Sequence, residues 1–159
     1  MSKNKNNKPI WGTRIKKNAS TLFKKVGSSL PVDKRLFKED IEGSIAHVEM
    51  LHKQKIINFR IKNKIIWGLK RIKNEIVKKK FNFDYDLEDI HMNIENRLFE
   101  LIGDDAGYVH TARSRNDQVI TDLKLWLKEA TKKIVILLDN TNSNILNLAQ
   151  KNIRTIMPG

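Results

Sequence analysis

The sequence predicts an all-α protein, and three observations support that prediction. Apolar residues recur every three or four positions along four segments, which is the spacing of one helix face. No segment alternates convincingly between apolar and polar residues, as a half-buried strand does. The chain has 159 residues, 40% of them hydrophobic, which is enough for one domain with a core.

The first two helices are expected over 33–54 and 56–80. Pro31 disfavours helix at Leu30, so residues 30–32 should be extended or lead into a helix. Asp33 can cap the helix that follows or complement its dipole. The apolar positions of the two segments are Leu36, Ile41, Ile45, Val48 and Leu51, then Ile57, Ile61, Ile65, Leu69, Ile72 and Ile76.

A third helix is expected over 87–102, after a turn at 81–86. Its apolar face consists of Ile90, Ile94, Leu98 and Leu101. Gly103 is suited to end this helix, because glycine readily adopts the left-handed conformation found after a helix C-terminus. The residues that follow, 104–107, predict a loop.

The last helix is expected over 115–152 and is the longest. Ser114 is a favourable N-cap residue, and no proline follows before Pro158. At 1.5 Å per residue the helix would be roughly 57 Å long. An apolar stripe of that length needs other helices to cover it, from this chain or from partners. The positions along the stripe are Val119, Leu123, Trp126, Ala130, Ile134, Leu137, Thr141, Ile145 and Leu148.

Charge is unevenly distributed along the chain. The net charge is +13, but residues 1–80 carry 22 Lys and Arg against 6 Asp and Glu, whereas residues 81–159 carry 9 against 12. Basic proteins often bind nucleic acid or another polyanion. Here the lysines are interleaved with Ile and Asn, a bias that an AT-rich genome imposes on any protein. We therefore favour a solvated basic surface and do not expect nucleic acid as the partner.

The composition also excludes several classes of protein. No apolar run reaches the 18 residues of a membrane span, and Met1–Lys8 lacks the apolar centre of a secretory signal. The chain has no cysteine, which excludes disulfides and thiol chemistry. We expect residues 1–10 to be a disordered tail and the protein to be cytoplasmic.

Residues 110–118 read HTARSRNDQ and are the most informative feature of the chain. They place the guanidinium groups of Arg113 and Arg115 and the carboxamide of Asn116 at the start of the last helix. Free backbone N–H groups and the helix dipole favour an anion there, and the planar fork of arginine matches a carboxylate. The pattern fits a site for a carboxylate-bearing small molecule. The alternative is that the two arginines pair only with neighbouring acids, namely Asp104, Asp105 or Asp117.

Five segments together resemble the argininosuccinate lyase family of the fumarase/aspartase superfamily. Residues 110–118 resemble its H-T-x-R-S-R-N-D-Q signature. The other segments, in chain order, are WGTR at 11–14, Ser28-Ser29 with DKRL at 33–36, DIEGSIAHVEML at 40–51, and EDIH at 88–91 with Glu95 and Leu98. The resemblance implies an N-terminal helical lyase domain over 11–112. It implies that 113–159 begins the first long helix of a central helical bundle, truncated here.

The resemblance also implies an activity, the elimination of fumarate from argininosuccinate to give arginine. A base removes a proton beside a carboxylate, and fixed donors hold the charge that develops on it. The resemblance implies that Ser29, Arg113, Arg115 and Asn116 bind substrate and that His91 supports the site without transferring a proton. From spacing alone, His91 could instead bond Glu95 one turn later. Neither a metal nor a cofactor is implied.

The sequence departs from the family pattern in three respects. Thr13 stands where a second glycine is usual, and Gly27 stands where asparagine is usual, two residues before Ser29. The family's T-H-L-Q segment would follow Gly159, and the G-S-S loop with the serine proposed as base would lie far downstream. We therefore expect the chain to be the front third of a family member, inactive alone and part of a homotetramer at full length.

Two other functions stay open at this stage. One is a basic helical module that binds a polyanion through the N-terminal lysines and Lys78, Lys79 and Lys80, which steep loss of binding with salt would reveal. The other is a lyase of the same superfamily with a different substrate, such as adenylosuccinate or aspartate. The signature favours argininosuccinate, and fumarate release from each substrate would decide between them.

Overall fold

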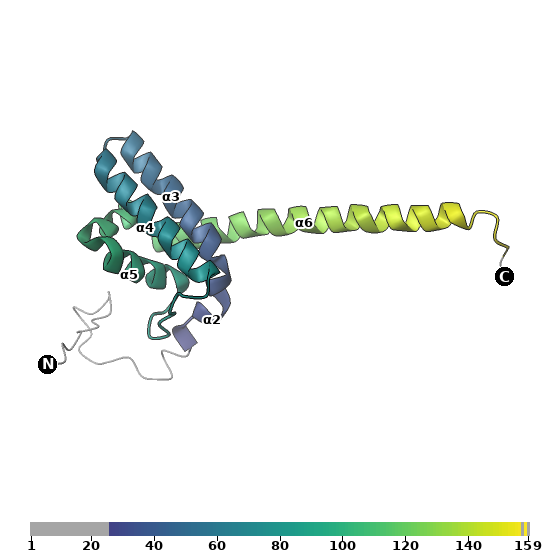
Figure 1. The fold of residues 1–159 in the computed structure, drawn as a ribbon, viewed down its shortest axis with the longest axis horizontal. Helices are drawn as coiled ribbons and strands as arrows, with labels where there is room; N and C mark the ends of the chain where they lie inside the picture. Colours follow the sequence, from purple (N-terminus) through teal and green to yellow (C-terminus); the bar gives the residue numbers. More distant parts are fainter. Residues whose placement is uncertain (1–25, 157, 159) are drawn as a thin grey trace.

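The computed structural model describes residues 26–156 and 158, and every regular element in this part of the chain is helical (Figure 1), which confirms the all-α prediction. The predicted tail at 1–10 and the WGTR segment at 11–14 lie outside the described residues. The elements, in order, are α2 (Leu30–Asp33), the 3-10 helix η1 (Lys34–Leu36), α3 (Phe37–Lys53), α4 (Phe59–Val77), α5 (Ile90–Ile102), the 3-10 helix η2 (Gly103–His110) and α6 (Arg115–Lys151).

The helices α3, α4 and α5 pack against one another around one apolar core, and α6 projects from this group as a long rod (Figure 1). Most of the predicted apolar positions of the first three helices are buried here. The buried core consists of Leu30, Ile41, Val48, Leu51, Ile57, Ile65, Leu69, Ile72, Ile90, Ile94, Leu98, Ile102, Ala106 and Val109. Their burial is the main source of stability, because each apolar side chain removed from water contributes roughly 1.5–3 kcal/mol.

Side-chain caps explain where α4 and α5 begin. The Oδ1 atom of Asn58 accepts a hydrogen bond from the backbone N–H of Ile61, so α4 starts at Phe59 rather than at 56. The Oδ1 atom of Asp89 likewise accepts a hydrogen bond from the backbone N–H of Met92, so α5 starts at Ile90 rather than at 87. Gly103 ends α5 with a φ of 72°, as predicted.

Three other predicted boundaries are wrong, the simplest being the end of α4, which is at Val77 rather than at 80. The first predicted helix, 33–54, is broken into α2, η1 and α3, and the helical turn already begins at Leu30 with Pro31 in its first turn, where proline needs no N–H partner. The predicted loop at 104–107 is part of η2, because Ala106 and Val109 are buried in the core and hold that segment in place.

Gly68 allows α4 and α5 to approach closely. A Cβ atom at this position would overlap the Cδ1 atom of Leu98 on α5, and Ile102 lies next to it. Both α5 residues are buried, so their side chains have little room to move away. The absence of a side chain at Gly68 therefore sets the distance between the two helices.

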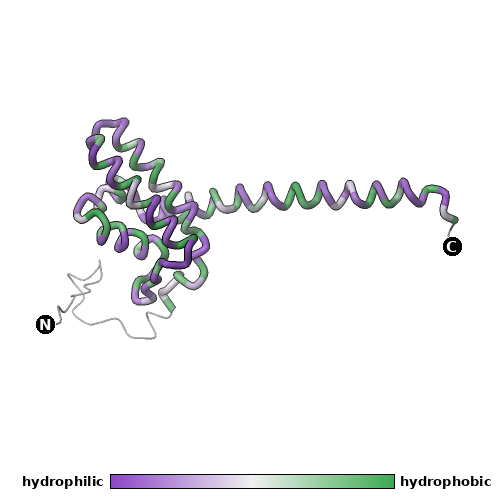
Figure 2. Tube along the Cα trace, viewed as in Figure 1, coloured by the Kyte–Doolittle hydropathy of each residue, from purple (hydrophilic) through white to green (hydrophobic). Residues whose placement is uncertain are grey.

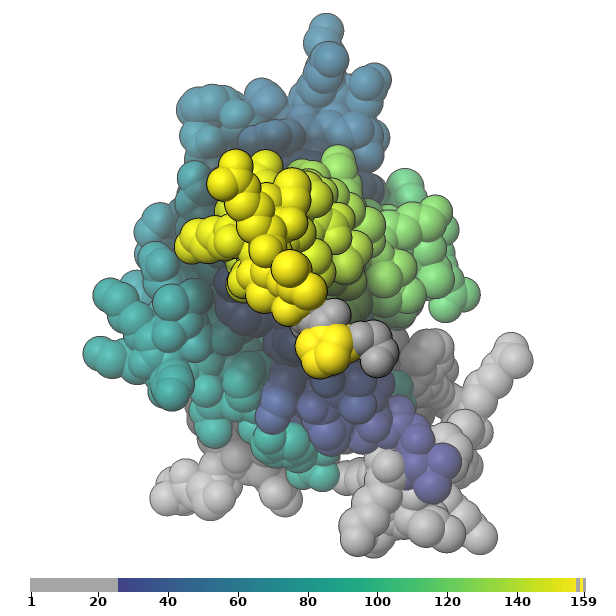
Figure 3. Space-filling view, turned by 90° about the vertical axis from the view of Figure 1, so that its right-hand side faces the viewer, coloured from purple at the N-terminus to yellow at the C-terminus, as the bar shows by residue number. Residues whose placement is uncertain are grey.

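The long helix α6 spans Arg115–Lys151 and begins at Ser114, as predicted. Ser114 and Asp117 form a reciprocal capping box, in which the side chain of each residue accepts a hydrogen bond from the backbone N–H of the other. Figure 3 looks along α6 from its C-terminal end, towards the helical group behind it. The turn before α6 is where we predict the N-terminal domain to end at Ala112, and this domain division stays a prediction.

The apolar stripe of α6 is largely exposed. Figure 2 shows apolar residues recurring along the whole rod, and Ile134, Leu137, Ile145 and Leu148 are each more than half exposed. Only Gln118 and Asp122 of this helix are buried among the described residues. In the described part of the chain, no helix has the combination of length and apolar character that a membrane span requires.

Candidate functional site

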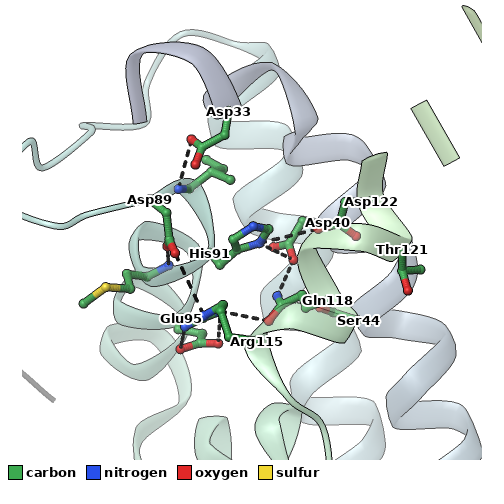
Figure 4. A network of polar contacts seen from close by, with 12 residues as sticks. Asp33, Asp40, Ser44, Asp89, His91, Glu95, Arg115, Gln118, Thr121 and Asp122 are labelled. Atoms are coloured by element: carbon green, nitrogen blue, oxygen red, sulfur yellow. Dashed lines mark hydrogen bonds and ion pairs between the residues drawn. The ribbon is translucent and has the colours of Figure 1, made fainter. Parts of the chain in front are cut away.

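The starts of α2, α5 and α6 converge on one polar network (Figure 4). The backbone N–H groups of Ser29 and Leu30 donate to the carbonyl oxygen of Glu88 at 2.9 and 3.2 Å, which holds the start of α2 against the start of α5. The hydroxyl of Ser29 donates to Asp33 Oδ2 at 2.5 Å. Asp33 Oδ1 in turn accepts from the N–H of Ile90 at 3.2 Å. Asp33 thus serves the start of α5 and not, as predicted, the helix that follows it.

Arg115 lies between two acidic residues of the α5 region. Its Nη1 and Nη2 atoms donate to the two carboxylate oxygens of Glu95, each at 2.9 Å, and its Nε atom lies 4.0 Å from Asp89 Oδ2. Nη1 also donates to the Gln118 side chain at 2.8 Å. The sequence alternative was right that acids pair with this arginine, but wrong about their identity. Glu95 lies on α5, twenty residues earlier, and Asp89 caps the start of that helix, whereas 104, 105 and 117 are not partners.

Arg113 and Asn116 lie on either side of Arg115 in the chain but have different surroundings. Arg113 turns towards α3, where its Nη2 atom donates to Ser44 Oγ at 3.1 Å, and its Nε atom is buried without a hydrogen-bond partner. Burial lowers the pKa of Arg113, against the raising effect of the nearby Asp40 carboxylate. Asn116 is exposed at the start of α6, and its backbone N–H donates to Ser114 Oγ. The signature therefore divides into an inward-facing arginine and an exposed carboxamide.

His91 lies at the buried centre of the network. Its Nδ1 atom is 3.0 Å from Asp40 Oδ1 on α3 and 3.5 Å from Asp122 Oδ2 on α6, and all three side chains are at most 2% exposed. Asp40 Oδ1 also accepts a hydrogen bond from Gln118 Nε2. The alternative from spacing, in which His91 bonds Glu95, is wrong, because Glu95 pairs with Arg115 and His91 contacts Asp40.

Asp40, Gln118 and Asp122 were not predicted from the sequence as members of this network. A signal was present, since Arg115, Gln118 and Asp122 are spaced by three and four residues and share one face of α6. The apolar stripe on the same helix predicted, however, that the apolar face would pack against the rest of the chain. Only the packing shows that the polar face is the one that contacts α3 and α5.

The two buried carboxylates of the network have different protonation behaviour. Burial opposes ionisation of Asp40, but the hydrogen bond and charge of His91 outweigh it and lower the pKa of Asp40. Burial and the neighbouring Asp40 carboxylate raise the pKa of Asp122 to about 7. Burial disfavours the imidazolium form of His91, yet the hydrogen bond to Asp40 and the surrounding carboxylates raise its pKa. The pair Asp40–His91 is thus ionic, and Asp122 is the carboxyl group that takes up a proton.

A metal ion is one conceivable occupant of this cluster. Asp40, His91 and Asp122 each offer a ligand atom, and these atoms lie within 4.8 Å of one another. The imidazolium of His91 nevertheless offsets the Asp40 carboxylate, and Asp122 takes up a proton or faces the guanidinium of Arg113, so the cluster needs no added cation. The absence of a metal cofactor stays a prediction.

A surface groove of about 470 Å³ lies elsewhere, between the end of α4 and α5. None of the network residues described above lines it. Its lining residues are Glu75, Lys80, Phe81, Asn82, Phe83, Asp84, Tyr85, Asn93, Asn96, Arg97 and Glu100. The candidate site is therefore defined by the polar network and not by this groove.

Substituting Asp122 with asparagine is expected to flatten the pH dependence of stability. The folded-state pKa of about 7 exceeds the ordinary value of 3.8. The stabilising contribution of this proton is therefore complete below pH 3.8 and is lost as the pH rises from 3.8 through 7. Stability then falls with rising pH by up to roughly 1.4 kcal/mol per pH unit for one proton. Urea unfolding at several pH values measures this slope. An unchanged slope in Asp122→Asn, relative to the exposed-site control Asp139→Asn, would contradict the assignment.

Substituting Ala112 with glycine is expected to stabilise the chain by about 0.5–1 kcal/mol. Ala112 has a φ of 54°, a left-handed conformation that is strained for alanine, and a hydrogen bond of 2.9 Å between His47 Nε2 and the Thr111 carbonyl holds the turn in place. Glycine relieves the strain but loses more backbone entropy on folding. The midpoint of urea unfolding measures the net gain, and a lower midpoint would show that the turn is not strained.

Comparison with known proteins identifies relatives over nearly the whole chain. A family model described as lyase matches residues 13–159. The chain is 67% identical, over all 159 residues, to an argininosuccinate lyase of Pelagibacter ubique (strain HTCC1062), and this match spans 34% of that protein. It is 51% identical over 151 residues to an argininosuccinate lyase of Ehrlichia chaffeensis, covering 95% of this chain and 32% of the relative.

A third relative agrees with the first two. An argininosuccinate lyase of Bartonella bacilliformis is 43% identical over 159 residues, which cover all of this chain and 34% of that protein. The chain thus spans about a third of the length of the curated relatives it matches. These matches include the signature segment and the residues of the polar network. The chain belongs to the lyase family.

Proposed function

We propose that the chain is the N-terminal part of an argininosuccinate lyase, which eliminates fumarate from argininosuccinate to give arginine. The observation that carries this proposal is that His91 and the start of α6 meet in one polar network (Figure 4). Ser29 is joined to the start of α5 beside this network through Asp33. These residues lie far apart in the sequence, and the family resemblance had assigned them to one site. The 67% identity to a protein of that name supports the same substrate over the other substrates of the superfamily.

The network suggests a division of roles among the proposed site residues. Ser29 and Asn116 are exposed at its edge, where their hydroxyl and carboxamide can hydrogen-bond a substrate. Arg115 is a quarter exposed, and the N–H groups not given to Glu95 and Gln118 can face a substrate carboxylate. Two further acids favour a cationic portion of the same molecule, namely Asp89, whose carboxylate lies 4.0 Å from Arg115, and Asp33, which accepts the N–H of Ile90 at the start of α5. His91 is buried and held by Asp40, which suits a supporting role.

The proposal assigns Arg113 a more indirect role than the sequence suggested. Its guanidinium is directed towards Ser44 and the buried acids. In that position it offsets their charge and steadies the turn before α6. The groups that transfer protons would come from the part of the lyase beyond this chain, so the chain alone should be inactive.

We propose a homotetramer for the complete protein and a cytoplasmic location. The exposed apolar stripe of α6 supports self-association, because a stripe of this length is unfavourable in water. The helices that cover it would come from the remainder of the lyase and from neighbouring subunits.

A fusion protein tests the proposed activity. The chain would be joined to the remaining two thirds of the Pelagibacter relative in place of that protein's own first third. We expect fumarate release from argininosuccinate, and a large loss of that activity in Asn116→Ala. Release of fumarate only from adenylosuccinate or aspartate would overturn the substrate assignment. A folded fusion that is inactive on all three compounds would overturn the proposal itself.

The alternative of polyanion binding has its best support on α4. There Lys62 lies 4.6 Å from the ring centre of Phe59 and Arg71 lies 5.6 Å from that of Trp67, which places cations beside exposed aromatic rings. Such pairs also occur on solvated surfaces, and α4 does not take part in the polar network. We expect the chain not to retain RNA or DNA at moderate salt. Retention that weakens steeply with added salt would favour the alternative.

A further inference from the structure

The long helix α6 contacts the rest of the described chain mainly through polar side chains. Arg115, Gln118 and Asp122 occupy one face of its first two turns, and Gln118 and Asp122 are its only buried residues among those described. Apolar neighbours such as Ile120 and Leu123 are exposed by 50% and 41%. Docking of this helix therefore depends on directional hydrogen bonds more than on apolar contact.

Gln118 links the buried acid to the arginine at the edge of the site. Its Nε2 atom donates to Asp40 Oδ1, and its Oε1 atom accepts from Arg115 Nη1 at 2.8 Å (Figure 4). A carboxamide offers one donor end and one acceptor end, so both ends are used in the correct sense. The side chain thus fixes where the Arg115 guanidinium stands relative to Asp40 and His91.

Asp122 lies one turn further along α6, near the same Nδ1 atom of His91 that Asp40 contacts. Its Oδ2 atom is 3.5 Å from His91 Nδ1 and accepts no hydrogen bond from any described residue. The acids that act on His91 come from every surrounding element, namely Asp33 in α2, Asp40 on α3, Asp89 before α5 and Asp122 on α6. The guanidinium of Arg113, before α6, acts on Asp40 and Asp122. Within this set, Asp40 and Asp122 are the acids closest to His91, at 3.0 and 3.5 Å.

We propose that Gln118 and Asp122 are positioning residues that dock the start of α6 on the buried Asp40–His91 pair and thereby place Arg115 and Asn116 in the site. Successive side chains of an α-helix point in directions about 100° apart. A rotation of α6 about its own axis would therefore turn Asn116 away from the site. Apolar contacts tolerate such rotation, whereas a satisfied buried polar network selects one arrangement. The catalytic part of this inference rests on the proposed function.

The docking itself is tested on the chain as it stands. The titration of the His91 imidazole is followed by ¹⁵N NMR in the unmodified chain, in Asp122→Asn and in the control Asp139→Asn, which removes an exposed acid from the same helix. We expect the His91 midpoint to fall in Asp122→Asn, because a carboxylate beside its Nδ1 atom is lost, and to stay unchanged in the control. An unchanged midpoint in Asp122→Asn would overturn the docking role.

The positioning role is tested in the fusion protein described above. Gln118→Met keeps the length and volume of the side chain but removes both hydrogen bonds. We expect the KM for argininosuccinate to rise about tenfold while kcat changes less than about threefold, because substrate binding is lost and the proton-transfer groups stay in place. Leu98→Ala serves as the structural control, since it weakens the core without touching the network, and its KM should not change.

Two outcomes separate the inference from the proposed function. An unchanged KM in Gln118→Met, or an equal rise in Leu98→Ala, would overturn the positioning role even in an active fusion. An unmodified fusion that does not act on argininosuccinate would overturn the proposed function. In that case the His91 titration still decides whether Asp122 docks α6.

Discussion

Replacing Asp40 with alanine is expected to destabilise the chain by about 3–5 kcal/mol, the cost of removing one partner from a buried ion pair. Asp40 is 1% exposed and accepts hydrogen bonds from both His91 and Gln118. Without it, the imidazolium would lose its closest carboxylate and keep only Asp122 at 3.5 Å, and Gln118 would lose the acceptor for its N–H. The pKa of His91 would then fall in the folded state, which lowers stability as the pH becomes acidic.

Urea unfolding of the unmodified chain and of Asp40→Ala measures this effect. Asp40→Asn keeps a hydrogen-bond acceptor but removes the charge, so its loss should be smaller. Asp139→Ala, an exposed acid on α6, is the matched control and should change stability by less than about 0.5 kcal/mol. A loss below about 1 kcal/mol in Asp40→Ala would mean that the Asp40–His91 pair contributes no more than an exposed ion pair.

Replacing Leu98 with alanine is expected to cost about 2–5 kcal/mol, through lost apolar burial and the cavity that remains. Leu98 is fully buried between α4 and α5, and its Cδ1 atom fills the space left by the missing side chain of Gly68. The surroundings are closely packed and can collapse only partly. Leu101, which is partly buried on the same helix, is the matched control, and Leu101→Ala should cost less.

Gly68 provides a test of the same contact from the other side. Gly68→Ala alone should destabilise by about 1–3 kcal/mol, because the added methyl group overlaps Leu98. In the double variant Gly68→Ala with Leu98→Ala, the methyl group enters the space that Leu98 vacated. The loss should therefore be smaller than the two single losses added together. Additive losses would show that the two residues do not compete for one space.

Much of the helical structure was predictable, because its causes are local. The three-and-four spacing of apolar residues located α3, α4, α5 and α6, and Ser114 and Gly103 marked two helix ends as expected. The starts of α4 and α5 were misplaced by three residues each. Their caps, Asn58 and Asp89, lie two residues after the predicted starts at 56 and 87, and only the backbone conformation shows that these side chains cap the helices.

The candidate site was predictable only as a list of residues. The signature pointed to Arg113, Arg115 and Asn116, and the family resemblance added Ser29 and His91. Their partners could not be read from the chain, because Glu95 and Asp40 lie 20 and 78 positions from the α6 residues they contact. Local spacing proposed Asp104, Asp105 and Asp117 for the arginines and Glu95 for His91, and each proposed pair was wrong.

The sequence by itself determined that α6 forms and that it carries both an apolar and a polar face, since side-chain periodicity and capping are properties of neighbouring residues. The tertiary structure decided which face meets α3 and α5. The polar face docks there because Asp40, His91 and Glu95 offer matched donors, acceptors and charges at the right positions. Buried polar groups must find partners, and those partners come from helices distant in sequence.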